Sequence, residues 1–298
     1  MSLKLISKIT GRILGKQGWR LVRVRPRRRE VAQLSRAAAH CAIEDVDDVR
    51  FRTSDWVYSV PVERLVGRPI FGYGPQSWHP LVAASAELLE DMDLPYELSI
   101  LKRFYETFTP RTVADAYRLD DPGPLTAVPA ATLFEPWRLA PPPLDDPTTS
   151  TYAAGSPLFG PLTRAAGEAQ WRRLRGRVKS ILAFGYQPDL FPQGLIRVTV
   201  LKIRHERRYL VGHGQHRAAV LAAMGHERID VGIHVANPPV ADEAEASMWP
   251  HVLSGFLSTE QARAMLRRYF APPASDPALQ IGAAARGGEV PSGAMAGP

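Results

Sequence analysis

Cysteine and long apolar runs are scarce in this sequence. Cys41 is the only cysteine among 298 residues, which excludes an internal disulfide and a thiolate zinc cluster. No apolar run approaches the roughly 18–20 residues that a membrane-spanning helix needs. The first residues also lack the continuous apolar segment and the small-residue cleavage site of a signal peptide. We therefore expect a cytoplasmic protein.

Acidic residues are absent from residues 1–29, which hold ten of the 37 Lys and Arg residues. The other 27 basic residues are outnumbered by the 30 acidic ones, so the net charge of +7 belongs to the N-terminal arm. A nucleic-acid-binding domain carries its positive charge on the folded surface. We therefore do not expect nucleic acid as a partner of the folded part.

The basic arm, residues 1–29, is predicted to begin with an amphipathic helix over residues 3–16. Its basic and apolar residues fall on opposite sides of the helix: Lys4, Lys8, Arg12 and Lys16 against Ile6, Ile9, Ile13 and Leu14. Residues 1–20 can bind an anionic membrane surface, or can dock on the chain's own domain with their charges solvated. The segment Arg25–Arg29 can instead bind nucleic-acid phosphates, a weaker alternative because no aromatic residues are interleaved there.

Strand and helix patterns alternate after residue 55, which favours the α/β class. Strands are predicted at residues 56–62, 196–203, 208–211 and 229–235, and helices at 80–92, 96–108, from about 112, 162–183, 215–224 and 259–270. Residues 121–147 are Pro-rich and are expected to be extended or irregular. The Ala/Gly/Pro/Ser-rich tail, residues 271–298, is expected to be disordered.

The most informative segment is Tyr209–Gly225, which reads as strand, glycine-containing turn, helix and glycine stop. Gly212 and Gly214 permit a sharp turn and a close approach of the backbone to a ligand. The helix start offers free N–H groups to an anion, and His216 and Arg217 lie in its first turn. This pattern predicts a phosphate-binding turn. The alternative is a tight turn whose histidine and arginine only cap or pair locally.

The sequence Gly214-Gln215-His216-Arg217, between an apolar strand and an Ala-rich helix that ends at Gly225, resembles the ParB/sulfiredoxin-like superfamily. The similarity covers roughly residues 55–235. It implies an α+β fold, with a small mixed sheet and helices in a domain over residues 30–270. A large, mostly helical and Pro-rich insertion is then expected at residues 66–160.

Known members of this superfamily bind nucleotides through that turn. The resemblance therefore implies ATP or CTP as cofactor, with Mg²⁺ bridging the phosphates, and a binding set of Gly212, His213, Gly214, Gln215, His216 and Arg217. His213 replaces an Asp that often precedes the motif. Gln215 stands where sulfiredoxin has its catalytic cysteine, which excludes reduction of a sulfinic acid there.

A kinase of this superfamily requires a carboxylate that accepts the proton of the attacking hydroxyl. Glu168 is the first candidate and Glu63 the second, although neither matches a family motif. His216 is the third catalytic candidate. Five histidines lie close in sequence without metal-ligand spacing, so we expect no metal site among them: His205, His213, His216, His226 and His234.

The whole chain is also similar to a family of bacterial proteins, of unassigned chemistry, that occur with polysaccharide-synthesis genes. The shared residues include His79-Pro80, Pro136-Trp137 and Trp249-Pro250-His251. The leading hypothesis is a nucleotide-dependent, kinase-like phosphotransferase that acts on a small polar or sugar substrate in such a pathway. The alternatives are a ParB-type nucleotide-binding regulator or DNA-associated protein, and a non-catalytic scaffold that retains the fold.

Overall fold

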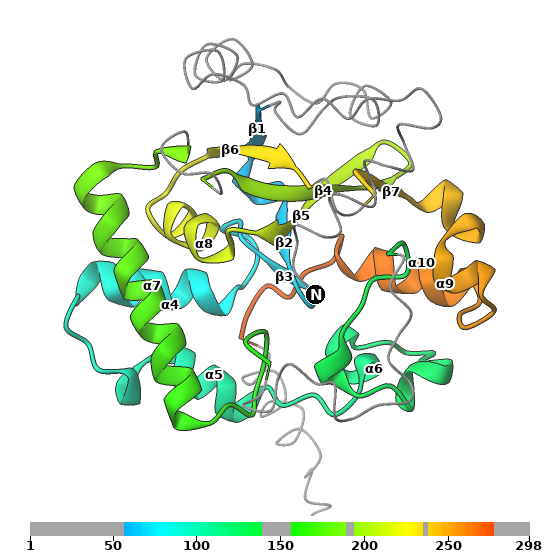
Figure 1. Cartoon of the computed structure of the whole chain (residues 1–298), viewed down its shortest axis with the longest axis horizontal. Helices are drawn as coiled ribbons and strands as arrows, with labels where there is room; N and C mark the ends of the chain where they lie inside the picture. The colour runs from blue at the N-terminus through cyan, green and yellow to red at the C-terminus, as the bar shows by residue number, and fades with distance from the viewer. Residues whose placement is uncertain (1–56, 139–155, 189–193, 235–237, 277–298) are drawn as a thin grey trace, which may run out of the picture.

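The computed structural model describes residues 57–138, 156–188, 194–234 and 238–276. Seven strands in these ranges form one mixed sheet in the order β1-β6-β4-β5-β2-β3, with β7 beside β4 (Figure 1). The strands are β1 (Val57–Pro61), β2 (Leu65–Gly67), β3 (Phe71–Gly72), β4 (Ile196–Ile203), β5 (Glu206–His213), β6 (Arg228–Ile233) and β7 (Val240–Asp242).

The β4–β5 hairpin is the centre of this sheet. Its strands pair antiparallel, with Val200 opposite Tyr209, while β6 and β7 pair parallel with successive parts of β4. On the other side, β2 pairs parallel with β5. Because side chains alternate along a strand, Val200 belongs to one buried cluster and its neighbour Leu201 to another. The sheet is therefore covered on both faces.

Four helices pack over the face to which Val200 points: α4 (Pro80–Glu90), α5 (Ile100–Thr107), α7 (Arg164–Phe184) and α8 (Gln215–Ala223). Each contributes buried apolar side chains to the same cluster, as helices do when they cover a sheet. The longest of them, α7, contacts α4, α5 and α8, and Figure 1 shows it along the outer left side of this layer. This layer contains the Gly212–Arg217 turn.

The opposite face is covered by α6 (Val113–Tyr117), α9 (Pro250–Leu253) and α10 (Thr259–Arg268), with 3-10 turns at Gly123–Thr126 and Glu243–Met248. Two of these helices begin with capping boxes, at Thr112 and at Ser258. Tyr117 and Tyr269 join α6 to the end of α10 through a 2.9 Å hydroxyl–hydroxyl hydrogen bond. The buried residues of this layer form a cluster separate from the one that contains α8.

Helix α7 combines a buried stripe with a basic exposed face. Trp171, Leu174, Val178 and Ile181 are buried at spacings of three and four residues, as an amphipathic helix requires. The Thr163 hydroxyl accepts a hydrogen bond from Ala166 N at the start of the helix. The helix ends at Gly185, whose φ of 71° suits a residue without Cβ.

The mixed α/β class predicted from the sequence is confirmed, and most predicted elements match observed ones to within a few residues. Strands β2, β3 and β7 and helix α9 are not predicted by the sequence patterns. The sheet therefore continues into the beginning of the segment 66–160. A ParB/sulfiredoxin-like arrangement stays a prediction. The arm at residues 1–29 and residues 277–298 lie outside the described residues.

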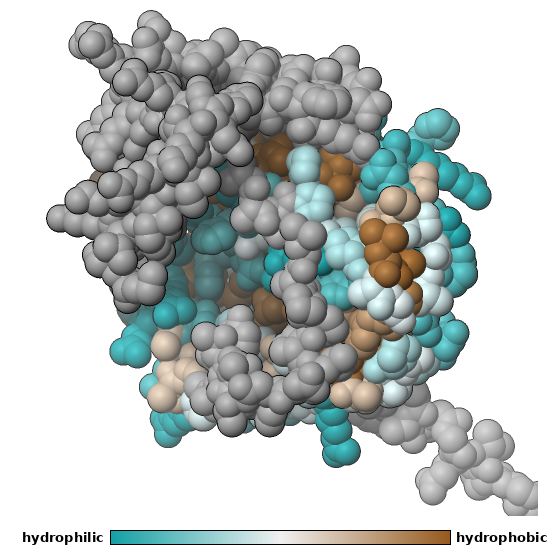
Figure 2. All heavy atoms as spheres, turned by 45° about the vertical axis from the view of Figure 1, so that its right-hand side comes forward, coloured by the Kyte–Doolittle hydropathy of each residue, from teal (hydrophilic) through white to brown (hydrophobic). Residues whose placement is uncertain are grey.

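A search of the helices in the described ranges finds none that is both long and apolar enough to cross a membrane. Figure 2 shows one face of the molecule, on which hydrophilic side chains are interspersed with small hydrophobic areas. The binding of residues 1–20 to an anionic membrane surface stays a prediction, since that segment is not among the described residues.

Candidate functional site

The turn between β5 and α8 is a helix start without a side-chain cap. Gly214 is the N-cap residue with a φ of 87°, and no side chain accepts from the first turn. Ala218 is the first residue of α8 whose N–H bonds back, to Gly214 O at 3.0 Å. Within the described residues, the N–H groups of Gln215, His216 and Arg217 have no acceptor. N–H groups without an acceptor at the start of a helix favour the binding of an anion.

Both glycines of the turn are required by close contacts. A Cβ at Gly214 would lie 2.9 Å from Arg217 Nη2 and 3.1 Å from Ile196 Cγ1, in a backbone conformation that L residues rarely adopt. A Cβ at Gly212 would lie 2.8 Å from His234 Cδ2. The turn is therefore packed tightly from behind, which fixes the direction in which its N–H groups point.

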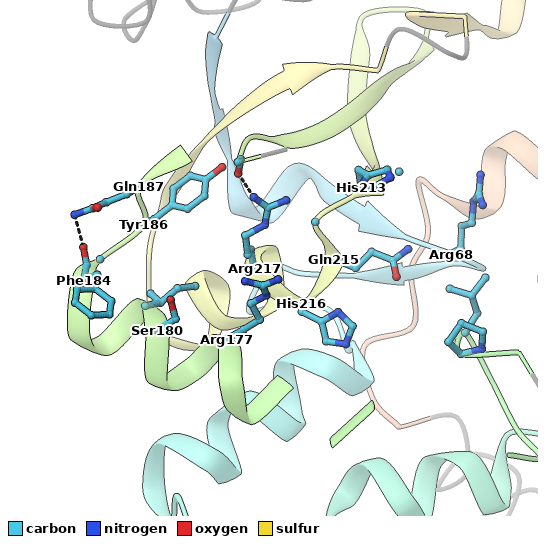
Figure 3. A pocket seen from close by; sticks show the side chains of 17 residues that line it. Arg68, Arg177, Ser180, Phe184, Tyr186, Gln187, His213, Gln215, His216 and Arg217 are labelled. Carbon is cyan, nitrogen blue, oxygen red and sulfur yellow. Dashed lines mark hydrogen bonds between the residues drawn. The ribbon is translucent and has the colours of Figure 1, made fainter. Parts of the chain in front are cut away.

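The turn borders a cavity of about 800 Å³ (Figure 3). The cavity lies between the C-terminal end of α7, the residues that follow α7 and the β5–α8 turn, with Arg68 on its far side. Its described lining residues are Arg68, Pro157, Leu158, Arg177, Ser180, Ile181, Phe184, Gly185, Tyr186, Gln187, Gly194, Gly212, His213, Gly214, Gln215, His216 and Arg217. All six predicted binding residues thus line one cavity.

Arg217 lines the cavity, but its guanidinium bonds to the protein. Nη1 donates to Gly194 O, and Nη2 donates to Leu195 O at 3.5 Å. Burial lowers the pKa of Arg217, and the nearby cation Arg177 acts in the same direction. The prediction that Arg217 contacts phosphate directly is therefore not supported by its hydrogen bonds, which fix the turn against the segment before β4.

Tyr186 also holds the segment that leads into β4. Its hydroxyl accepts a hydrogen bond from Ile196 N and donates one to Asp230 O, both at 3.1 Å. Burial raises the pKa of Tyr186 to about 12, so the hydroxyl keeps its proton at neutral pH. The start of β4, β6 and the end of α7 are thereby joined beside the cavity.

Arg177 is a cation that the sequence analysis missed. It lies on the exposed face of α7, lines the cavity, and has no hydrogen bond or ion pair among the described residues. Its charge acts on both His216 and Arg217, which places it near the start of α8. The i, i+4 pair Arg173 and Arg177 was the signal available in the sequence.

His216 is held neutral at the edge of this cavity. Burial lowers its pKa to about 4, and repulsion from Arg173 and Arg177 contributes. Its Nε2 atom is buried without a hydrogen-bond partner in the described part of the chain. Behind it, burial lowers the pKa of His79 to about 3, with His216 contributing; His79 Nδ1 accepts from Leu81 N at the start of α4.

The two carboxylates proposed as catalytic bases lie elsewhere. Glu168 is in the second turn of α7, where its Oε1 pairs with Arg164 Nε at 3.0 Å, and it is not among the residues that line the cavity. Glu63 lines a different cavity of about 760 Å³, which adjoins Tyr73, His79 and Glu227. Of the three predicted catalytic residues, His216 lines the cavity, whereas Glu168 and Glu63 do not.

Mg²⁺ prefers carboxylate and other oxygen ligands. The described residues that line the cavity include no Asp or Glu, and the described part of the chain contains no group of three potential His, Cys, Asp or Glu ligands. The described residues at the turn therefore do not fit a Mg²⁺ ion bound by protein carboxylates.

Comparisons of the chain with protein-family models, with curated proteins and with solved structures find no match.

Proposed function

We propose that this protein binds a phosphorylated ligand of the nucleotide class in the Gly212–Arg217 cavity, with a phosphate at the start of α8. One observation carries the proposal: the three N–H groups of Gln215, His216 and Arg217 have no acceptor in the described residues, at a helix start that borders the cavity. Helix starts of this kind bind phosphate through backbone N–H groups and the helix dipole.

The charge around the cavity supports an anionic ligand. Arg68, Arg177 and Arg217 line it, and the described lining residues include no carboxylate. Arg177 has no other partner there and can add a charge-assisted hydrogen bond to a phosphate oxygen. Arg217 contributes its charge while its N–H groups hold the turn.

The size and lining of the cavity support a ligand larger than phosphate alone. Small-molecule sites typically have volumes of about 300–1,000 Å³, and this cavity has about 800 Å³. Its lining includes the apolar side chains of Leu158, Ile181 and Phe184, which can contact a base or sugar ring. Ser180 and Gln187 add neutral hydrogen-bonding groups at the same end.

Phosphotransfer to a small polar or sugar substrate is the second candidate function. It is favoured by the unpartnered Nε2 of His216, because a neutral imidazole can accept the proton of a substrate hydroxyl. A pKa of about 4 makes His216 a weak base, and no described carboxylate of the cavity can replace it. We therefore rank binding above catalysis.

Calorimetric titration with ATP, CTP and inorganic phosphate, followed by product analysis with sugar acceptors, tests the proposal. Saturable binding of a nucleotide without turnover supports a binding or regulatory role of the ParB type. Transfer of the phosphoryl group that is lost in His216→Gln supports the kinase-like alternative. Absence of saturable binding of all three probes contradicts both.

A further inference from the structure

On the far side of the cavity, Arg68 is held by a fully buried carboxylate. It lies in the turn between β2 and β3, where its Nε contacts Glu135 Oε1 and its Nη2 donates to Glu135 Oε2 at 2.8 Å. The Glu135 side chain is 0% exposed. A guanidinium edge paired in this way with a buried carboxylate has a fixed orientation.

The second edge of Arg68 is available to a ligand. Nη1 has no partner in the described residues, and the side chain keeps 18% of its surface exposed where it lines the cavity. Arg138 Nε also pairs with Glu135, at 2.6 Å. Because Glu135 is shared by two guanidinium groups, its single negative charge does not neutralise both of them.

The start of α8 and Arg68 are separate parts of one cavity. Figure 3 shows Arg177 and Ser180 on one side, Arg68 on the other, and the Gln215 side chain extending from α8 toward the side of Arg68. The described residues that line the cavity include no acidic side chain. A single phosphate bound at α8 therefore leaves the Nη1 edge of Arg68 without an anion.

We infer that the ligand carries two separated anionic groups: a phosphate that binds at the start of α8, and a second phosphate, sulfate or carboxylate that binds Arg68. The inference rests on the proposed function, since it assumes the phosphate site at α8. Arg68 is then the residue that selects a doubly anionic ligand over a singly anionic one. Glu135 is a positioning residue that holds Arg68.

A series of α,ω-alkane bisphosphonates, each compared with the monophosphonate of the same chain length, measures this selection by calorimetric titration of the full chain. The expected result is an optimum length at which the bisphosphonate binds at least about 10-fold more tightly than its monophosphonate, equivalent to about 1.4 kcal/mol. Arg68→Gln should remove this gain, so that the bisphosphonate and its monophosphonate bind the variant with similar affinity.

Variants of Glu135 and Arg68 separate positioning from folding. Glu135→Gln should keep the cation but reduce the gain, because the orientation of Arg68 is no longer fixed by a carboxylate. If Arg68→Gln does not fold, Arg68→Lys takes its place; it retains the charge but loses the second N–H edge, so the gain should still fall.

Equal binding of mono- and bisphosphonates at every length, or a gain that survives in Arg68→Gln or in its replacement Arg68→Lys, overturns the inference while leaving the phosphate site at α8 intact. A different result contradicts the proposed function, namely that neither inorganic phosphate nor any monophosphonate binds the wild-type protein.

Discussion

The guanidinium of Arg217 donates a hydrogen bond to the carbonyl oxygen of Gly194 and so ties the first turn of α8 to the segment that leads into β4. Arg217 is half-buried, and its second contact is to Leu195 O. The arginine of the Gly-x-His-Arg sequence therefore shapes the binding turn from within the protein. Its contribution to a ligand is its charge and the position of the neighbouring N–H groups.

Replacing Arg217 should affect folding and binding together. Arg217→Ala removes charge-assisted hydrogen bonds to two backbone carbonyls, so we expect the free energy of unfolding to fall by about 1–3 kcal/mol. Phosphate affinity should fall as well, because the turn loses its support. Urea denaturation and calorimetric titration check the two effects, and an unchanged unfolding free energy contradicts the assigned role.

Replacing Arg177 should affect binding alone. Arg177 is exposed and has no partner among the described residues, so Arg177→Gln should change the unfolding free energy by less than about 0.5 kcal/mol. The affinity for phosphate should fall about 5- to 10-fold, since one charge-assisted hydrogen bond is lost. Arg172→Gln is the matched control, an exposed cation of the same helix that does not line the cavity. If both variants lower the phosphate affinity equally, the loss is due to the reduced net charge of the protein and not to a contact of Arg177.

Gly214 and Gly225 form a matched pair at the two ends of α8. Both have positive φ, 87° and 80°, but only Gly214 would place a Cβ against neighbours, while at Gly225 nothing lies within 4 Å. Gly225→Ala should cost about 1 kcal/mol of stability from backbone strain alone. Gly214→Ala should cost clearly more and should abolish phosphate binding. Comparable costs would show that the turn has room for a methyl group.

The buried histidines predict a loss of stability in mild acid. The pKa values of His79 and His216, about 3 and about 4 in the folded chain, lie below the ordinary value of about 6.5, so the unfolded chain binds more protons between these limits. Stability is complete above pH 6.5 and falls as the pH falls. Each histidine should contribute at most about 2 kcal/mol of this loss by pH 5.

Urea denaturation between pH 7 and pH 5 measures this dependence. His216→Gln and His79→Asn should each flatten it, and asparagine retains the ability to cap α4 at position 79. His226→Gln is the control, because His226 is exposed. A dependence as steep in the two buried-site variants as in the control would contradict the assignment.

The strands and helices with clear periodicity were predictable from the sequence. The Tyr209–Gly225 segment forms a strand, a turn at Gly214 and a helix as its pattern predicts, because the two glycines and the apolar spacing act locally. Strands β2 and β3 have only three and two residues. They depend on pairing with β5 and with each other, which no local pattern reveals.

The residues that line the cavity were predictable only in part. The six residues of the turn are consecutive in sequence, so a motif identifies them. Arg177 reaches the cavity from α7, and Arg68 reaches it from the β2–β3 turn, through tertiary packing alone. Glu168 is on the same helix as Arg177, but it lies nine residues, about 14 Å of helix, nearer its start. The sequence shows that the two residues share a helix, but not which end of that helix borders the cavity.

The central claim is that an anion binds the N–H groups at the start of α8, and ¹H–¹⁵N NMR during titration with inorganic phosphate tests it most directly. The account predicts that the amide signals of Gln215, His216 and Arg217 shift together and saturably, with a single dissociation constant that rises in Arg177→Gln. The account is contradicted if these three amide signals stay unchanged. It is also contradicted if they shift without saturation and no more than the amide signals of the rest of the chain.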